Sequence, residues 1–415
     1  MIPAVIERCA GIDVGKKFVV VCLMTGKANE APATDTRKFG TVRIELERLR
    51  EWLKAEHCTH VVMESTGCYW KPVLNVLEDD PEYKLQVILA NAKEVRPRKG
   101  HKTDRDDACH LAHLLRHGSI RPSFIPPRAI RELRDLTRRR KQMIGIAADE
   151  RNRVQKVLED ANVKIGDVLS DVFGLSGQMM LEALVEGKAS PAEIADLAQK
   201  QARKKIAQLT TALEGHQMRD THRSLIRHAM RHMAFLADEV ESLDGEIQRL
   251  IWDAGLDRAH QLVQTLPGIQ RTAAATILAE GGPDMSQFPT EAKFSAWSGL
   301  APGNNESAGK RKRSPSLQGN PHIKCAFVES AWSASRTKDS EFNRYYQRLC
   351  PRLGHKRALV AVAHLLAIRV YEVLSTHQPY ERQPELAPKN IGRLIRHHTR
   401  RLNCLHRWLE NSEQV

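Results

Sequence analysis

Residues 9–24, CAGIDVGKKFVVVCLM, place two apolar runs on either side of a short polar turn. The runs Cys9–Val14 and Phe18–Met24 have the length and composition of β-strands. The intervening Gly15-Lys16-Lys17 is typical of a tight turn, so the two runs predict a β-hairpin near the start of the chain.

The rest of the first 125 residues alternates helical and strand patterns. Apolar residues recur at helical spacing at Leu46, Leu49 and Leu53. The elements expected after them are a strand at His60–Glu64, a helix at Trp70–Asp79, a strand at Leu85–Ala90 and a helix from Asp104. This alternation predicts an α/β domain over residues 1–125, with one sheet and flanking helices.

A proline-rich stretch, residues 121–128, is expected to end this domain, and residues 126–260 then read as a helical, coiled-coil segment. Its apolar residues alternate spacings of three and four, as in a coiled-coil seam: Ile226, Ala229, Met233, Leu236, Val240, Leu243, Ile247 and Leu250. The seam could be covered by the earlier helix around residues 133–157, by another subunit, or by both. We favour both, and therefore expect an oligomer.

Residues 261–385 predict a mainly α-helical domain interrupted by one long loop. The turn Leu266-Pro267-Gly268-Ile269 before a helix could offer backbone N–H groups to a phosphate, or could be an ordinary turn between helices. The loop, residues 299–321, is rich in Gly, Pro, Ser and Asn and carries the run Lys310, Arg311, Lys312 and Arg313. Residues 386–415 read as a basic helical tail that includes Arg400 and Arg401.

The composition points to a polyanionic partner. The chain has 64 Lys and Arg against 50 Asp and Glu, a formal net charge of +14, which favours nucleic acid as the partner.

No apolar stretch reaches the roughly 20 residues of a membrane span, and the start of the chain lacks a signal-peptide pattern, so a cytoplasmic protein is expected. Eight cysteines without a CxxC pair suggest neither a zinc cage nor a disulfide framework.

Four carboxylates form the candidate catalytic set. Asp13 and Glu64 lie on apolar strands, where a charged group must be compensated, and Asp104 and Asp107 share one helical face behind the expected N-cap Thr103. Such oxygens can converge as Mg²⁺ ligands for phosphodiester chemistry, in the order of an RNase H-like nuclease core. The structural alternative is strand-edge acids and ordinary helix caps, and Asp106 is expected to be a solvated bystander.

Seven sequence blocks carry a family resemblance. They are GIDVGKK, VVMESTGCYW, KTDRDDACHLAHLLRHG, LPGIQRTAAATILAE, FSAWSGLAPG, NNESAGKRKR and QGNPHIK, in this order over essentially the whole chain. The sequence resembles the transposases of the insertion sequence 110 family, which are related to Piv-type DNA invertases. The resemblance implies a RuvC-like N-terminal domain with a DEDD acidic set, a coiled-coil middle, and a C-terminal transposase domain that supplies a nucleophilic serine.

Transferred residue by residue, the DEDD acids fall on the four carboxylates already chosen, and the serine falls on Ser307, with Ser314 and Ser316 as alternatives. The segment after residue 313 departs from the family pattern at Leu317 and Gln318, which puts backbone contacts of the loop in doubt. From the residues alone, Ser307 is a serine beside four cations, where a phosphate could bind, or a loop serine bonded to its own backbone.

The resemblance implies a mechanism and its partners. Mg²⁺ at the acidic set would polarise the scissile phosphate, Ser307 would attack it, and a covalent phosphoserine linkage would allow rejoining. A structured guide (bridge) RNA would pair with donor and target DNA, and a dimer or tetramer would supply several active centres. The cations expected to contact nucleic acid are Lys310, Arg311, Lys312, Arg313, Arg138, Arg139, Arg140, Lys141, Arg400 and Arg401.

Two other functions remain open at this point. A hydrolytic RuvC-like nuclease would use only the acidic set, with the C-terminal domain as a DNA clamp. A non-catalytic RNA- or DNA-binding scaffold would use only the coiled coil and the basic tail.

Overall fold

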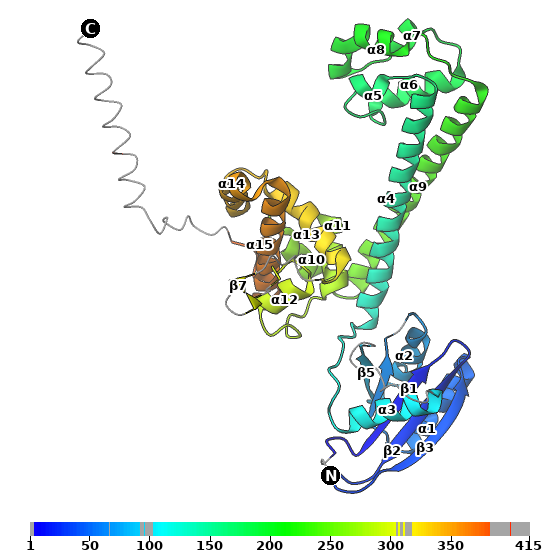
Figure 1. Ribbon diagram of the computed structural model, residues 1–415, viewed down its shortest axis with the longest axis vertical. Coiled ribbons are helices and arrows are strands. Elements are labelled where there is room, and N and C mark those ends of the chain that lie inside the picture. The colour runs from blue at the N-terminus through cyan, green and yellow to red at the C-terminus, as the bar shows by residue number, and fades with distance from the viewer. Residues whose placement is uncertain are drawn as a thin grey trace. The chain divides into compact units, whose positions relative to one another are not determined.

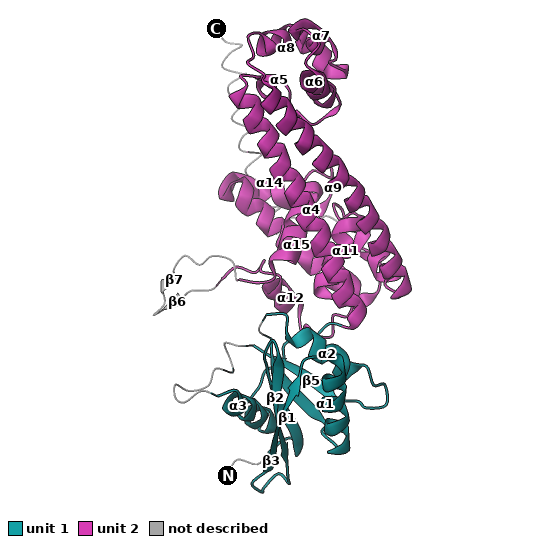
Figure 2. Ribbon diagram, turned by 90° about the vertical axis from the view of Figure 1, so that its right-hand side faces the viewer, with its two compact units in different colours: residues 1–126 teal, residues 127–415 magenta. Residues whose placement is uncertain are grey.

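The computed structural model describes residues 4–65, 67–91, 95, 103–303, 306–307, 310–311, 318–381 and 399. The chain divides into two compact units, residues 1–126 and residues 127–415 (Figure 2). The four-part division expected from the sequence stays a prediction.

Unit 1 is built on a five-stranded mixed sheet of order β3-β2-β1-β4-β5 (Figure 1). The predicted hairpin is confirmed, since β1 (Arg8–Val14) pairs antiparallel with β2 (Phe18–Thr25). The predicted strands β4 (His60–Glu64) and β5 (Gln86–Ala90) run parallel to β1. The strand ends of β1 and β4 therefore meet at the same edge of the sheet.

The edge strand β3 (Ala33–Gly40) was not expected from the sequence. It pairs antiparallel with β2, and its sequence, ATDTRKFG, is mostly polar with no fully buried residue. An edge strand with little burial needs no apolar run, and charged side chains on such an edge discourage pairing with other chains.

Helices cover both faces of the sheet. Helices α1 (Arg43–Ala55) and α2 (Trp70–Glu78) share one apolar core with the sheet, which includes Ile12 and Met63. The helix α3 (Asp104–Arg116) packs on the other face, in a second core that includes Cys9, Val62, Ala108 and Ala112. Neighbouring residues along β1 and β4 thus alternate between the two cores.

At Gly11 the backbone of α3 lies directly against the sheet. A Cβ atom at Gly11 would lie 2.2 Å from the Ala108 carbonyl oxygen and 2.4 Å from the Ala112 nitrogen. We expect Gly11→Ala to lower the free energy of unfolding by about 1–3 kcal/mol, because backbone of a packed helix must move. Gly145→Ala is the matched control: nothing lies within 4 Å of its Cβ, and in a helix interior it should stabilise by about 0.5–1 kcal/mol. Urea unfolding of both variants tests this, and equal effects would contradict the close packing.

Unit 2 contains a long antiparallel helix pair, α4 (Arg128–Asp160) and α9 (Asp220–Asp253). Leu133 of α4 packs with Ile247 at one end of the pair, and Val154 packs with Ile226 at the other. The expected seam is therefore covered by the earlier helix of the same chain. Seam residues that are fully buried include Ile226, Leu236 and Ile247.

A small helical group connects α4 to α9. It consists of α5 (Ile165–Val168), α6 (Leu175–Glu186), α7 (Pro191–Asp196), the 3₁₀ helix η1 (Lys200–Lys205) and α8 (Ile206–Leu213). These elements bury a core of their own against the adjoining ends of α4 and α9 (Figure 1).

The rest of unit 2 is a helical bundle with a short hairpin. Its elements are α10 (Asp257–Gln264), α11 (Arg271–Gly281), α12 (Glu291–Trp297), β6 (Glu306–Ser307), β7 (Lys310–Arg311), α13 (Pro321–Ala334), α14 (Glu341–Leu353) and α15 (His355–Thr376). The sequence had not indicated α14. The predicted basic tail, including Arg400 and Arg401, lies outside the described residues.

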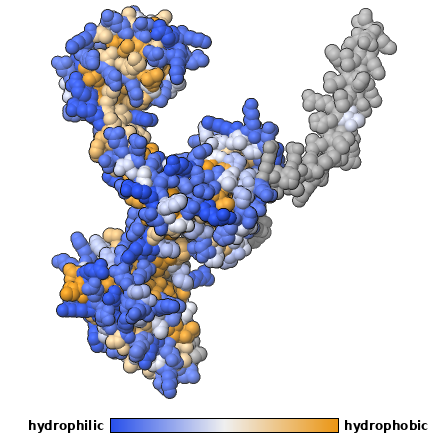
Figure 3. Space-filling view, turned by 180° about the vertical axis from the view of Figure 1, so that it is seen from behind, coloured by the Kyte–Doolittle hydropathy of each residue, from blue (hydrophilic) through white to orange (hydrophobic). Residues whose placement is uncertain are grey.

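Helix α15 is the core helix of this bundle. Among the described helices it alone has the length and apolar composition to cross a membrane, with 22 residues and a mean hydropathy of 1.7 over an 18-residue stretch. Its side chains Val362, Leu366 and Val370 are instead fully buried among the neighbouring helices. The space-filling view shows hydrophilic residues over most of the visible surface, with hydrophobic ones in small groups (Figure 3).

Candidate functional site

Two of the predicted acids lie side by side at one edge of the unit 1 sheet. In the parallel register Ile12 stands opposite Met63, so the next residues, Asp13 and Glu64, lie at the same level, with Glu64 the last residue of β4 and Asp13 the last but one of β1. Ile12 and Met63 face the core under α1 and α2, and therefore Asp13 and Glu64 face the opposite side, which α3 covers. Both side chains are half-buried.

The start of α3 brings the other two acids toward the same edge. Helix α3 runs antiparallel to β1: the Cys9 thiol donates to the Ala112 carbonyl at 3.7 Å, and Ala108 lies over Gly11. The first turn of α3, with Asp104 and Asp107, therefore points toward the end of β1. We call Asp13, Glu64, Asp104 and Asp107 the acidic edge.

Thr103 starts α3 as the sequence predicted. Its hydroxyl accepts a hydrogen bond from the Asp106 backbone N–H at 3.2 Å and donates to the Asp106 carboxylate at 2.7 Å. Asp106 is thus exposed but not merely solvated, since it completes the cap of the helix. This is a correction to its predicted role as a bystander.

The acidic edge has the donor chemistry of a Mg²⁺ site. Carboxylate oxygens are the ligands that Mg²⁺ prefers, and three separate elements supply them here. Over the described residues, no three Asp, Glu, His or Cys side chains stand close enough together to hold one metal ion. The structure thus brings the four acids to one region of unit 1 without assembling a closed ligand cage.

The loop that carries Ser307, residues 299–320, is anchored at both ends; we call it the serine loop. The Asn320 N–H donates to the Trp297 carbonyl at 3.0 Å. Gly319 approaches so closely that a Cβ on it would lie 2.3 Å from the Gly299 nitrogen. Between these anchors, Ser307 of β6 pairs with Lys310 of β7 in an antiparallel register.

A buried carboxylate, Glu280 of α11, links the end of the serine loop to α4. Glu280 is fully buried, and its oxygens accept from Arg138 Nε and Nη2 at 2.7 and 2.9 Å and from Asn320 Nδ2 at 2.7 Å. Arg134 adds an ion pair at 3.4 Å. Burial alone would raise the pKa of Glu280, but the hydrogen bonds from Arg138 and Asn320 and the charge of Arg134 outweigh burial and lower the pKa.

Asn320 has two roles in this network. While its amide N–H₂ donates to Glu280, its side-chain oxygen accepts from the His322 N–H at 3.0 Å and so caps α13. The sequence did not reveal Glu280, because one Glu in the Ala-rich stretch ATILAEGG looks like an ordinary helix-surface residue.

Three of the four cations predicted on α4 are paired with acids. Arg138 binds Glu280, Arg140 forms a bidentate pair with Asp244 of α9 at 2.6 and 2.9 Å, and Lys141 pairs with Glu329 of α13. Arg139 is exposed. These pairs hold α4 against α9, α11 and α13, while nucleic-acid contact by these cations stays a prediction.

The remaining predicted cations are described less fully. Lys310 and Arg311 are placed by their backbone in β7, whereas Lys312, Arg313, Arg400 and Arg401 lie outside the described residues.

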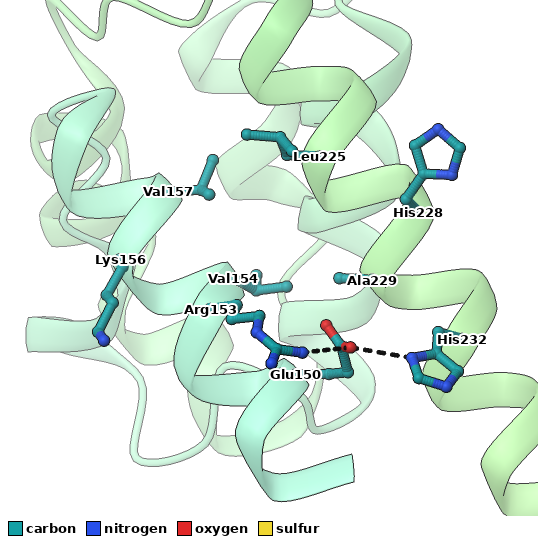
Figure 4. A pocket seen from close by; sticks show the side chains of 9 residues that line it. All are labelled: Glu150, Arg153, Val154, Lys156, Val157, Leu225, His228, Ala229 and His232. Carbon is teal, nitrogen blue, oxygen red and sulfur yellow. Dashed lines mark hydrogen bonds and ion pairs between the residues drawn. The ribbon is translucent and has the colours of Figure 1, made fainter. Parts of the chain in front are cut away.

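A cavity of about 690 Å³ lies between α4 and α9 (Figure 4). Its apolar lining includes Val154, Val157 and Leu225, and the Glu150 carboxylate meets Arg153 at 2.6 Å and His232 at 2.9 Å. Its lining contains none of the predicted site residues.

Comparison with known proteins matches both parts of the chain. Residues 10–163 match the family model of DEDD-type IS110 transposases, described as "Transposase", and residues 260–347 match the model described as "Transposase IS116/IS110/IS902 family". The chain is also similar to a probable family 20 transposase of Pseudomonas aeruginosa, with 24% identity over 356 residues, 83% of this chain and 93% of that protein.

The first matched segment contains the mixed α/β sheet and its acidic edge, which is consistent with an RNase H-like DEDD domain. The second contains Glu280 and the serine loop. The chain therefore belongs to the IS110 family of transposases, enzymes that cut and join DNA.

Proposed function

We propose that this transposase recombines DNA through a composite site, in which the acidic edge and Ser307 act on one phosphodiester. The observation that carries the proposal is the convergence of Asp13, Glu64 and the first turn of α3 at one end of the sheet. Mg²⁺ bound there would neutralise the charge that develops on the phosphate. The acids would hold and orient that ion, and oxygens of the DNA phosphate would complete its coordination.

Ser307 is the proposed nucleophile. Its oxygen would bond to phosphorus as the bond from phosphorus to a deoxyribose oxygen breaks, and the departing oxygen would take up one proton, in exchange for the one lost by serine, to leave as a free hydroxyl. The resulting phosphoserine linkage is itself a phosphodiester, so the DNA phosphate can be transferred from it to a second strand. The backbone pairing of Ser307 with Lys310 supports this role, because a nucleophile must be held in a defined position to react.

The proposed partners are donor DNA, target DNA and an element-encoded guide RNA in the cytoplasm. The net charge of +14 suits binding to several nucleic-acid strands at once. Cutting two strands at each of two sites calls for several active centres, and hence for a dimer or tetramer. Exposed apolar side chains on the α4–α9 pair, Leu225 at 50% and Phe235 at 56%, are consistent with subunit contacts there.

An assay in cells tests the guided recombination. A plasmid that carries the gene with its flanking non-coding DNA should yield rejoined donor–target junctions, detected by sequencing across them. Deletion of the flanking segment should abolish the junctions, and supplying that segment as a separate transcript should restore them. Junctions that persist without the segment would contradict RNA guidance, and free DNA ends without junctions would favour the hydrolytic nuclease.

A further inference from the structure

The surface where α13, α14 and α15 meet carries clustered aromatic side chains. Trp332 of α13 is 43% exposed, and its ring lies 4.8 Å from the ring of His355 at an interplanar angle of 85°. The Tyr346 hydroxyl lies 2.5 Å from His355 Nδ1. The Arg336 guanidinium lies over the Trp332 ring, 4.5 Å from its centroid. Side chains from three helices thus hold an exposed indole in a fixed position.

Further cations lie close in the chain to this cluster and are not neutralised by acids. Arg348, Arg352 and Lys356 are exposed on α14 and at the start of α15, close in the chain to Tyr346 and His355. Within the described part of the chain, neither these three nor Arg336 forms an ion pair, in contrast to Arg138 and Lys141. We call Trp332, Arg336, Tyr346, Arg348, Arg352, His355 and Lys356 the aromatic–basic surface.

The cations of α4 and those of the aromatic–basic surface differ in whether an acid already neutralises them. A guanidinium bound to a buried carboxylate, as Arg138 is to Glu280, has little charge left to offer a phosphate. Unpaired cations beside an exposed ring combine the two groups that a nucleotide needs, a positive charge for its phosphate and a flat apolar face for its base.

We propose that the aromatic–basic surface binds a single-stranded segment of nucleic acid, with an unpaired base stacked on the Trp332 ring and phosphates on Arg336 and on the exposed cations of α14 and α15. In a duplex, base faces are stacked on one another and cannot reach an indole, so the exposed ring selects for unpaired nucleotides. The proposal extends the recombination function by assigning a strand-binding surface to the helices after the serine loop, and it does not depend on the serine chemistry.

Binding to labelled oligonucleotides tests the stacking. Full-length protein is titrated into oligo(U) RNA and oligo(dT) DNA of about 20 nucleotides, and into a duplex of the same length, with fluorescence anisotropy as the readout. We expect Trp332→Ala to weaken binding of the single strands about tenfold and to leave the duplex unchanged. Trp332→Phe keeps a stacking ring and should stay within about threefold of wild type.

Trp252→Ala is the matched control, because Trp252 is 73% exposed and lies on α9. It should leave all three affinities unchanged. A larger loss for RNA than for DNA would identify RNA as the strand held there, and equal losses would indicate either strand; both support the proposal. No loss in Trp332→Ala, or an equal loss for the duplex, overturns it.

The salt dependence of binding tests the cations. The triple variant Arg348→Gln, Arg352→Gln and Lys356→Gln should reduce the slope of log K against log salt by about 2, as expected for three lost phosphate contacts on a single strand. The triple variant Lys188→Gln, Lys200→Gln and Lys204→Gln removes the same charge from exposed lysines near α6, η1 and α8. Equal changes in the two variants would show an effect of net charge alone and would overturn the proposal.

Failure of this proposal and failure of the composite site can be told apart. Asp13→Asn is expected to lower cleavage strongly but to retain full binding of single strands at the aromatic–basic surface. Loss of strand binding in Asp13→Asn would place the binding site elsewhere and would overturn the assignment.

Discussion

Asp13→Asn is expected to lower DNA strand cleavage by about three orders of magnitude, the equivalent of about 4 kcal/mol of transition-state stabilisation. The substitution removes one anionic oxygen from the acidic edge while keeping the size of the side chain. Because Asp13 is half-buried at the end of β1, the fold of unit 1 should persist. The measurement is the rate of strand cleavage in Mg²⁺, together with circular dichroism to confirm folding. Glu64→Gln should behave in the same way.

Asp106→Asn is the control for charge near the acidic edge. Asp106 belongs to the same turn of α3 as Asp104 and Asp107, but its carboxylate bonds to Thr103 and stays exposed. Cleavage should remain within about threefold of wild type, with at most about 1 kcal/mol of lost capping energy. Equal losses in Asp106→Asn and Asp13→Asn would show a general effect of negative charge and would contradict a specific ligand set.

Glu280→Gln is expected to destabilise unit 2 by about 3–5 kcal/mol, because it leaves the guanidinium groups of Arg134 and Arg138 beside a neutral amide in a buried site. Urea unfolding monitored by circular dichroism measures the loss. Glu159→Gln is the matched control, since Glu159 pairs with Lys164 but its side chain is 59% exposed. That surface pair should contribute less than about 1 kcal/mol, and equal losses in the two variants would contradict the buried network.

The lowered pKa of Glu280 gives this network a pH dependence. A carboxyl group whose pKa is lower in the folded protein than in the unfolded chain adds stability above the unfolded pKa. That stability is lost as pH falls from about the ordinary value of 4.5 through the folded pKa. The stability difference between wild type and Glu280→Gln should therefore shrink on acidification below about pH 4.5, and a constant difference would contradict the lowered pKa.

The sequence predicted the parts of the fold that rest on apolar periodicity. These parts are the hairpin β1–β2, the strands β4 and β5 and the helix α3, each with one or two buried faces. A buried face requires apolar residues at regular spacing, which can be recognised in the sequence. The edge strand β3 and the helix α14 bury few residues, so their sequences show little apolar periodicity. In α14 the buried side chains are Phe342 and Leu349, and the many charged residues and Pro351 make the helix hard to recognise from sequence.

The candidate site was predictable only in part. Asp13 and Glu64 stand out because carboxylates on apolar strands require an explanation, and the register of β1 and β4 supplies it. Glu280 could not be found in this way, since its partners Arg138 and Asn320 lie 142 and 40 residues away in the chain. For the same reason, sequence alone could not separate the paired cations of α4 from Arg336, which lies over Trp332 without an acidic partner.

The composite site is tested most directly by locating the covalent bond between protein and DNA. Protein incubated with Mg²⁺, guide RNA and DNA is denatured, digested with nuclease and protease, and analysed by mass spectrometry. A nucleotide joined through phosphate to Ser307, absent in both Ser307→Ala and Asp13→Asn, is the predicted result. Cleaved DNA with free ends and an unmodified Ser307, or a nucleotide on Ser314 or Ser316 instead, would contradict it.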